Sequence, residues 1–169
     1  MAAETDKTPF EQILDLLAEQ GVEFIVIGGQ AAVLHGVPIP TFDTDLCYRR
    51  DKENLRRLAE VLKKLQVSLR TPQGSVPFVA DARALEMGSN FTFNTAIGEK
   101  LDILGYVEPF GGYEQIVARA ETYIVAGHSV KTISLDDLIR IKQHILRDKD
   151  RAVLVQLRAI KQIRERQAP

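Results

Sequence analysis

A short apolar run that ends in two glycines constrains the fold of this chain more than any other feature. Phe24–Ile27 is continuous, apolar and rich in β-branched residues, which predicts a strand buried on both faces. Gly28 and Gly29 end the run, and residues 30–34 then have the character of one or two helical turns. Backbone N–H groups at such a strand-to-helix turn, together with the helix dipole, favour phosphate. The same two glycines also suit an ordinary tight turn, and both interpretations stay open.

Helices and further strands are predicted on both sides of this run. Residues 8–20 have helical spacing, with Thr8 and Glu11 placed as a capping box, and residues 51–65 carry a stripe of apolar side chains. Residues 66–77, which contain a Thr-Pro-Gln-Gly sequence, are expected to form a turn or loop. Strands are predicted at residues 45–49, 90–95, 100–106, 122–125 and 130–133, with a short helix at 113–118.

The last part of the chain is predicted to be helical. A helix begins at Ser134, breaks near Asp148 and resumes to Arg166. The fold class is therefore α/β (α+β), a mixed β-sheet flanked by helices with a helical C-terminal segment. We expect one domain over residues 1–169, with a core at about 8–133 and the helical segment at 134–166.

Composition limits the classes of protein that this chain can belong to. It has 45% hydrophobic and 27% charged residues, which is typical of a globular protein, and no apolar run approaches the roughly 20 residues that cross a membrane. The polar segment from Met1 to Phe10 lacks the apolar region of a secretory signal, and the single cysteine, Cys47, excludes a disulfide within the chain. We therefore expect a cytoplasmic protein with no membrane partner.

The charge is close to balanced overall but uneven along the chain. The net charge is −1, yet residues 140–166 contain nine Lys and Arg against three Asp and Glu. Such a stretch is either a helix with solvated charged faces or a surface that faces phosphate or RNA.

Three aspartates are candidates for a metal site. Asp43 and Asp45 are two residues apart at the mouth of a predicted strand, so in extended backbone both carboxylates point the same way and repel each other unless a cation lies between them. Asp102 lies among large apolar residues in the segment 100–104, where a charge is costly unless it is paired or coordinates a metal. Carboxylates of this kind suit Mg²⁺, which also binds substrate phosphates. The alternatives are a solvated turn for the first two and an edge strand for Asp102.

The ordered motifs resemble those of a known family. The chain carries in sequence Gly28-Gly29-Gln30-Ala31, His35-Gly36, Thr41-Phe42-Asp43-Thr44-Asp45, Leu101-Asp102-Ile103, Leu138-Ile139, Lys142 and Arg147-Asp148-Lys149-Asp150. This set is similar to the nucleotidyltransferase superfamily, which has the DNA polymerase β-like fold. The closer resemblance is to small bacterial proteins of the abortive-infection toxin type. This resemblance covers residues 21–150. Separately, His35 precedes Gly36 at a predicted helix end and is expected to be a capping or packing residue.

The resemblance implies a function and a site. It implies transfer of a nucleoside monophosphate from a nucleoside triphosphate to a hydroxyl of an RNA, protein or small-molecule acceptor. The residues implied as catalytic and metal-binding (Mg²⁺ or Mn²⁺) are Asp43, Asp45 and Asp102, and those implied as nucleotide-binding are Gly28, Gly29, Gln30, Thr41 and Lys142.

The chain departs from the family pattern at one position. Relatives usually carry an arginine where this chain has Ile39. The alternative function is therefore that of a weakly active or inactive protein of this fold that binds a cognate toxin or antitoxin.

Overall fold

The computed structural model describes residues 6–169, so the first five residues of the polar segment at the N-terminus lie outside it. Within these residues seven helices and eight strands follow one another along the chain. They are α1 (Pro9–Gln20), β1 (Phe24–Ile27), α2 (Gly28–His35), β2 (Asp43–Tyr48), α3 (Lys52–Lys64), β3 (Ser68–Thr71), β4 (Gly74–Pro77), α4 (Ala82–Met87), β5 (Asn90–Asn94), β6 (Lys100–Leu104), α5 (Tyr113–Val117), β7 (Glu121–Val125), β8 (His128–Thr132), α6 (Leu135–Ile145) and α7 (Asp148–Gln167).

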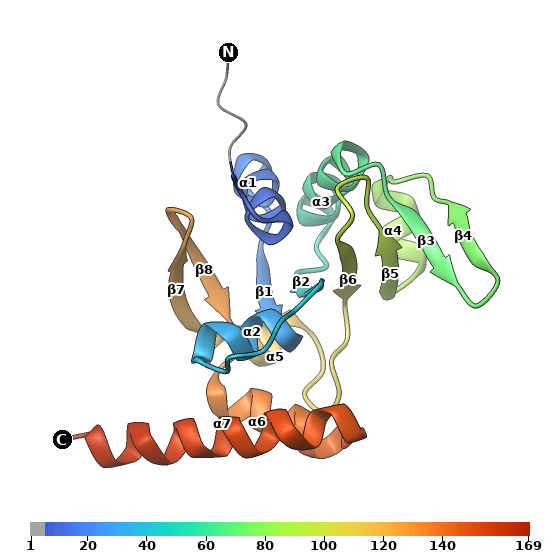
Figure 1. The fold of residues 1–169 in the computed structure, drawn as a ribbon. Helices are drawn as coiled ribbons and strands as arrows, with labels where there is room; N and C mark the ends of the chain where they lie inside the picture. The colour runs from blue at the N-terminus through green and yellow to red at the C-terminus, as the bar shows by residue number, and fades with distance from the viewer. Residues whose placement is uncertain (1–5) are drawn as a thin grey trace.

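All eight strands belong to one mixed sheet in the order β4-β3-β5-β6-β2-β1-β8-β7. β1 and β8 pair in parallel, as do β2 and β6, and the other neighbouring strands are antiparallel. Figure 1 shows α6 and α7 crossing one end of the sheet beneath α2, while α1 and α3 lie toward the other end. The predicted fold class, a mixed sheet flanked by helices with a helical C-terminal segment, is confirmed.

Local sequence signals place the first helix as predicted. The Thr8 hydroxyl accepts a hydrogen bond from the backbone N–H of Glu11 at 3.2 Å, and the Glu11 carboxylate accepts one from the N–H of Thr8 at 2.8 Å. These two bonds satisfy N–H groups that have no partner within the helix. Gly21 ends α1 in the left-handed conformation, with a φ of 68°.

Several elements differ from the sequence prediction. The stretch 66–77, expected to be a turn or loop, forms the antiparallel hairpin of β3 and β4, and only its central turn was predicted. α2 begins at Gly28, two residues earlier than predicted, and β2 begins at Asp43 rather than Asp45. Strand pairing forms β3 and β4 and extends β2 back to Asp43, while α2 starts directly at the Gly-Gly turn. These residues have only weak local preferences of their own.

The predicted break in the C-terminal helical segment is present. α6 ends where Leu146 adopts the left-handed conformation, and α7 begins at Asp148. Both helices contact α2, the helix that follows the first strand. The two helices therefore lie next to the Gly-Gly turn.

No helix within residues 6–169 has the length and apolar character needed to cross a membrane.

Candidate active site

The three aspartates come from two neighbouring strands of the sheet. β2 and β6 pair in parallel with Asp45 opposite Asp102 and Asp43 opposite Lys100. Residues directly opposite one another share a face of the sheet, and Asp43 shares the face of Asp45 because it is two residues away. All three carboxylates therefore lie on one face. Because β6 lies between β5 and β2, Asp102 is not on an edge strand, and that alternative is wrong.

The two glycines give these side chains the room that they need. Gly28 has a φ of 67°, and a Cβ atom at this position would lie 2.1 Å from Oδ2 of Asp45. A Cβ atom on Gly29 would lie 3.0 Å from the Thr41 hydroxyl, which itself donates a hydrogen bond to the carbonyl of Asp43 at 3.1 Å. The Gly-Gly pair thus brings the start of α2 into contact with the side chains of Thr41 and Asp45.

Asp45 is the most perturbed of the carboxylates. Burial, the neighbouring charge of Asp102, a hydrogen bond with Asp102 and the charge of Asp43 together raise the pKa of Asp45 to about 7, against a small opposing effect of Lys142. A raised pKa of this origin means that burial first, and the neighbouring carboxylates second, disfavour the ionised form of Asp45. A bound cation would favour the ionised form.

A divalent metal fits part of the donor set. Within residues 6–169 no three His, Cys, Asp or Glu side chains are arranged as a ready group of metal ligands. Asp102 is instead paired with Arg70, whose Nη2 donates to its Oδ1 at 2.5 Å. Asp43 and Asp45 remain, and Mg²⁺ is commonly held by one or two carboxylates together with substrate phosphates. These two residues fit Mg²⁺ or Mn²⁺.

A cavity of about 830 Å³ opens beside Asp43 and Asp45. Its lining includes the start of α2, the segment 39–43 and residues of α6 and α7. Asp102 is not among the lining residues. The cavity therefore joins the first two aspartates, rather than all three, to the C-terminal helices.

Lys142 reaches the cavity from α6, and a buried aspartate holds it there. Its ammonium group donates to Oδ1 of Asp150 at 2.8 Å, and Nε of Arg147 donates to Oδ2 of the same carboxylate at 2.8 Å. Burial by itself raises the pKa of Asp150, but the hydrogen bonds from Arg147 and Lys142 outweigh it and hold the pKa at about 2. Arg147 and Asp150 are three residues apart, so this part of the contact is local to the start of α7.

The remaining predicted nucleotide-binding residues differ in position. Gly28, Gly29 and Thr41 line the cavity together with Lys142. Gln30 is buried within α2 and is not among the lining residues. Ile39 also lines the cavity, so the position where the family resemblance led us to expect an arginine presents an apolar side chain to it.

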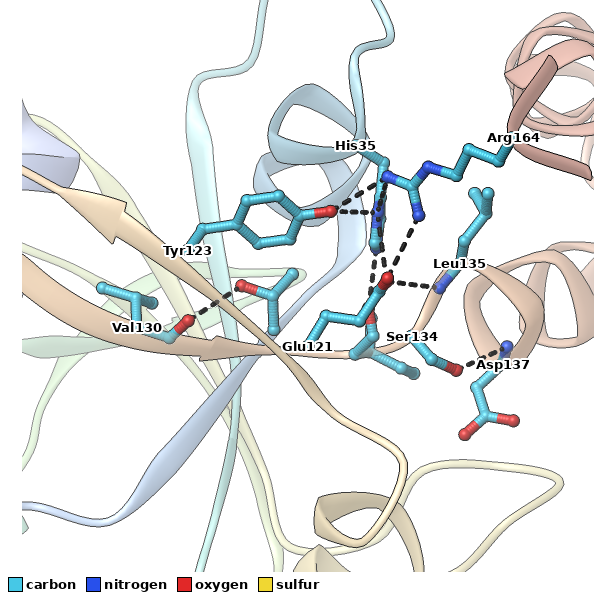
Figure 2. Close-up of polar contacts among 10 residues, drawn as sticks. His35, Glu121, Tyr123, Val130, Ser134, Leu135, Asp137 and Arg164 are labelled. Atoms are coloured by element: carbon cyan, nitrogen blue, oxygen red, sulfur yellow. Dashed lines mark hydrogen bonds and ion pairs between the residues drawn. The ribbon is translucent and has the colours of Figure 1, made fainter. Parts of the chain in front are cut away.

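His35 lies in a separate polar cluster and does not face the aspartates. Its Nε2 is 2.7 Å from the carbonyl of Ile133, and its Nδ1 is 2.9 Å from the Tyr123 hydroxyl and 3.2 Å from Nη2 of Arg164 (Figure 2). Because a carbonyl only accepts and a guanidinium only donates, Nε2 carries the proton and Nδ1 is bare. Burial, with the nearby Arg164 charge, lowers the pKa of His35 against the effects of Ile133 and Glu121. The packing role predicted for His35 is confirmed.

Sequence reasoning missed Arg70 and Lys100. Arg70 falls in the segment that was expected to be a loop, and Lys100 lies opposite Asp43 and lines the cavity. The sequence signal for Arg70 was weak, because Leu69 is the one apolar residue of Ser68–Thr71 and only the Pro-Gln-Gly turn that follows is typical of a hairpin.

Comparisons of sequence alone find no related protein. No family model and no curated protein matches the chain.

Comparisons of structure find the same fold in several solved proteins. The lincosamide antibiotic adenylyltransferase LnuA, in its lincomycin-bound form, matches with a TM-score of 0.62 and 17% identity over 89% of this chain and 95% of its own. An antigenic nucleotidyltransferase-like protein from Paracoccidioides brasiliensis matches with a TM-score of 0.56 and 16% identity over 87% of this chain and 72% of its own. A candidate nucleotidyltransferase from Thermotoga maritima matches with a TM-score of 0.54 and 16% identity over 87% and 88%. The chain therefore has the nucleotidyltransferase fold, with its three aspartates on one face of the sheet.

Proposed function

We propose that this chain transfers a nucleoside monophosphate group from a nucleoside triphosphate to a hydroxyl group. In this reaction the hydroxyl oxygen bonds to the α-phosphorus, the bond from that phosphorus to pyrophosphate breaks, and the hydroxyl proton passes to a base. One observation supports the proposal above all others: Asp43, Asp45 and Asp102 share a face of the sheet, directly beside the first turn of α2.

The proposal gives each residue a role. Asp43 and Asp45 hold Mg²⁺ or Mn²⁺, which when bound neutralises charge on the triphosphate. The backbone N–H groups at Gly28 and Gly29 face phosphate oxygens at the start of α2, an eight-residue helix. Lys142 reaches the triphosphate from the opposite wall of the cavity, and Asp102 accepts the proton of the attacking hydroxyl.

The charge of the cavity bears on the class of acceptor. Its lining contains four acidic and four basic residues, and the rest is largely apolar. An RNA acceptor draws on a surplus of Lys and Arg, which this balance does not supply. A small molecule or a protein hydroxyl therefore suits the cavity better, and the lincomycin-bound adenylyltransferase of the same fold supports a small molecule.

Calorimetry tests the proposal directly. Each of the four nucleoside triphosphates is titrated with Mg²⁺ into the wild type and into the Asp43→Asn/Asp45→Asn double variant. We expect binding of at least one triphosphate that needs Mg²⁺ and is lost in the double variant. Circular dichroism of both proteins checks that the substitutions leave the fold intact.

The opposite result would redirect the assignment. If no triphosphate binds to the folded wild type, the transferase function falls. The apolar Ile39 in the cavity then favours the alternative, a binding partner in a toxin–antitoxin pair, which pull-down with the product of a neighbouring gene would test.

A further inference from the structure

The three aspartates are not equivalent in their surroundings. Asp43 and Asp45 line the cavity, whereas Asp102 does not and is instead paired with Arg70. The side chains of Arg70 and Asp102 are both 24% exposed, so this ion pair is largely shielded from water. Charge-assisted hydrogen bonds of this kind are stronger than neutral ones and fix the geometry of both groups.

Arg70 is held in place by the sheet itself. Ser68 of β3 lies opposite Asn94 of β5, and Asn94 lies opposite Lys100 of β6. Arg70 is two residues beyond Ser68, so it lies on the face that carries the aspartates. Nη1 of Arg70 also donates to the carbonyl of Phe93 at 3.0 Å, which leaves Nη2 directed at Asp102.

We propose that Arg70 is a positioning residue that reserves Asp102 for the acceptor hydroxyl and keeps it out of the metal's coordination sphere. This inference rests on the proposed function, and it divides the carboxylates into two sets. Asp43 and Asp45 form the metal site, and Asp102 is held beside it by a guanidinium from β3.

The charges at the site support this division. Asp45 and Asp102 lie directly opposite each other and repel, and Arg70 compensates the second of them. Arg70 engages Oδ1 of Asp102 and so competes with a metal for that oxygen, and a metal that used either oxygen of Asp102 would also approach the guanidinium charge. The other oxygen of Asp102 remains to accept the proton when the hydroxyl oxygen bonds to phosphorus and pyrophosphate leaves.

A purely structural role for Arg70 makes a different prediction. If Arg70 only anchors the β3–β4 hairpin through the Phe93 carbonyl, its removal lowers stability but leaves metal binding unchanged. The affinity for metal alone therefore separates the two roles without any substrate.

The experiment measures Mn²⁺ affinity by electron paramagnetic resonance of the free ion. It uses the wild type, Arg70→Gln, Asp102→Asn and the double variant that combines them. We expect Asp102→Asn to weaken Mn²⁺ binding modestly, because it leaves the Arg70 charge uncompensated, but not to abolish it, since Asp102 is not a ligand. Arg70→Gln is expected to tighten binding by about tenfold, because a positive charge beside the site is removed and Asp102 is released to join the site, and the double variant is expected to lose that gain.

Two further variants keep the test decisive. Arg83→Gln removes the same charge from an exposed position on α4 and is expected to bind Mn²⁺ as the wild type does. Arg70→Lys keeps the positive charge, so it is expected to stay within about twofold of the wild type, well short of the change expected for Arg70→Gln. It also serves if Arg70→Gln does not fold.

Specific outcomes would overturn the inference. They are an Arg70→Gln affinity no tighter than that of wild type, a tightened affinity in Arg70→Lys, or a loss of Mn²⁺ binding in Asp102→Asn. Failure of the proposed function looks different: Mg²⁺-triphosphate does not bind to the wild type, whatever the pattern of Mn²⁺ affinities among the Arg70 and Asp102 variants.

Discussion

Gly28 and Asp45 depend on each other through a close contact between backbone and side chain. Oδ2 of Asp45 occupies the space that a Cβ atom would fill at position 28, where the backbone also has a positive φ. A side chain at this position would be strained and would displace the carboxylate that the proposed metal site needs. A single atom thus links the Gly-Gly turn to the Asp-Thr-Asp strand.

Gly28→Ala should therefore damage the site as well as the fold. We expect the free energy of unfolding to fall by about 1–2 kcal/mol, because the residue is held in the left-handed region. We also expect Mg²⁺-triphosphate affinity to fall by about 100-fold, because the carboxylate is displaced by about an ångström. Urea unfolding and calorimetry measure the two effects. Gly127→Ala is the control, since Gly127 has a φ of 82° with nothing within 4 Å, and it should lose stability without losing binding.

Asp45→Asn should stabilise the metal-free protein at pH 8. The pKa of Asp45 is raised in the folded state, so its favourable contribution is present below about pH 4, its ordinary range, and is lost as the pH rises through about 7. Removing the charge should raise the free energy of unfolding at pH 8 by on the order of 2 kcal/mol. Urea unfolding at pH 8 and pH 5 checks this. An equal difference between the two proteins at both pH values would contradict it.

At the scale of elements, a half-buried polar cluster joins α7 to the sheet. Nη2 of Arg164 on α7 donates to the Tyr123 hydroxyl at 3.0 Å, and Nη1 pairs with Glu121 at 3.1 Å, both on β7 (Figure 2). His35 at the end of α2 accepts from the same guanidinium, and it does so only while Nδ1 is bare. The protonation state of His35 therefore affects how α2, β7 and α7 are held together.

The stability of the protein should fall as the pH drops below about 6.5, partly through His35. Its pKa is lowered in the folded state, so the unfolded chain takes up a proton first, and the stabilisation present above the ordinary histidine pKa is lost in acid. The fall in urea midpoint from pH 7.5 to pH 5.5 should be smaller in His35→Gln than in wild type. His144→Gln, a change at an exposed histidine, should follow the wild type. If all three fall equally, His35 is not the titrating group.

For the whole molecule, the cavity is built from the C-terminal helices as well as the sheet. The sheet supplies the aspartates, and α6 supplies Lys142, whose position depends on Asp150 of α7. The Asp150 side chain is only 2% exposed and receives charged hydrogen bonds from Lys142 and Arg147. The junction of α6 and α7 is thus a structural part of the cavity wall.

Asp150→Asn should loosen this wall. Removing one partner of a buried ion pair leaves the others uncompensated, and we expect the free energy of unfolding to fall by about 3 kcal/mol. Mg²⁺-triphosphate affinity should fall as well, because Lys142 is no longer held. Asp148→Asn is a matched control two residues away, since the Asp148 side chain is 99% exposed, and its effect should stay within about 0.5 kcal/mol. An equal fall in the free energy of unfolding in both variants would show that the effect comes from removing a negative charge in the first turn of α7, and not from breaking the buried pairing of Asp150.

The sequence by itself determined the elements with strong local signals. The capping box at Thr8, the apolar stripe of α3 and the buried run Phe24–Ile27 each fix their structure through neighbouring residues, so these elements were predicted correctly. The two-residue spacing of Asp43 and Asp45 likewise places both carboxylates on one face of any strand that contains them. Periodicity and capping are local properties, and a single sequence displays them.

Only the tertiary structure decided which distant residues meet. The β3–β4 hairpin has little burial of its own and forms through pairing with β5, so it was missed, and Arg70 was missed with it. Three other contacts between distant residues were also not predicted: Lys142 with Asp150, His35 with Arg164, and Asp102 with Arg70. The register of paired strands and the packing of helices set these contacts over long separations in the chain, and no local pattern encodes them.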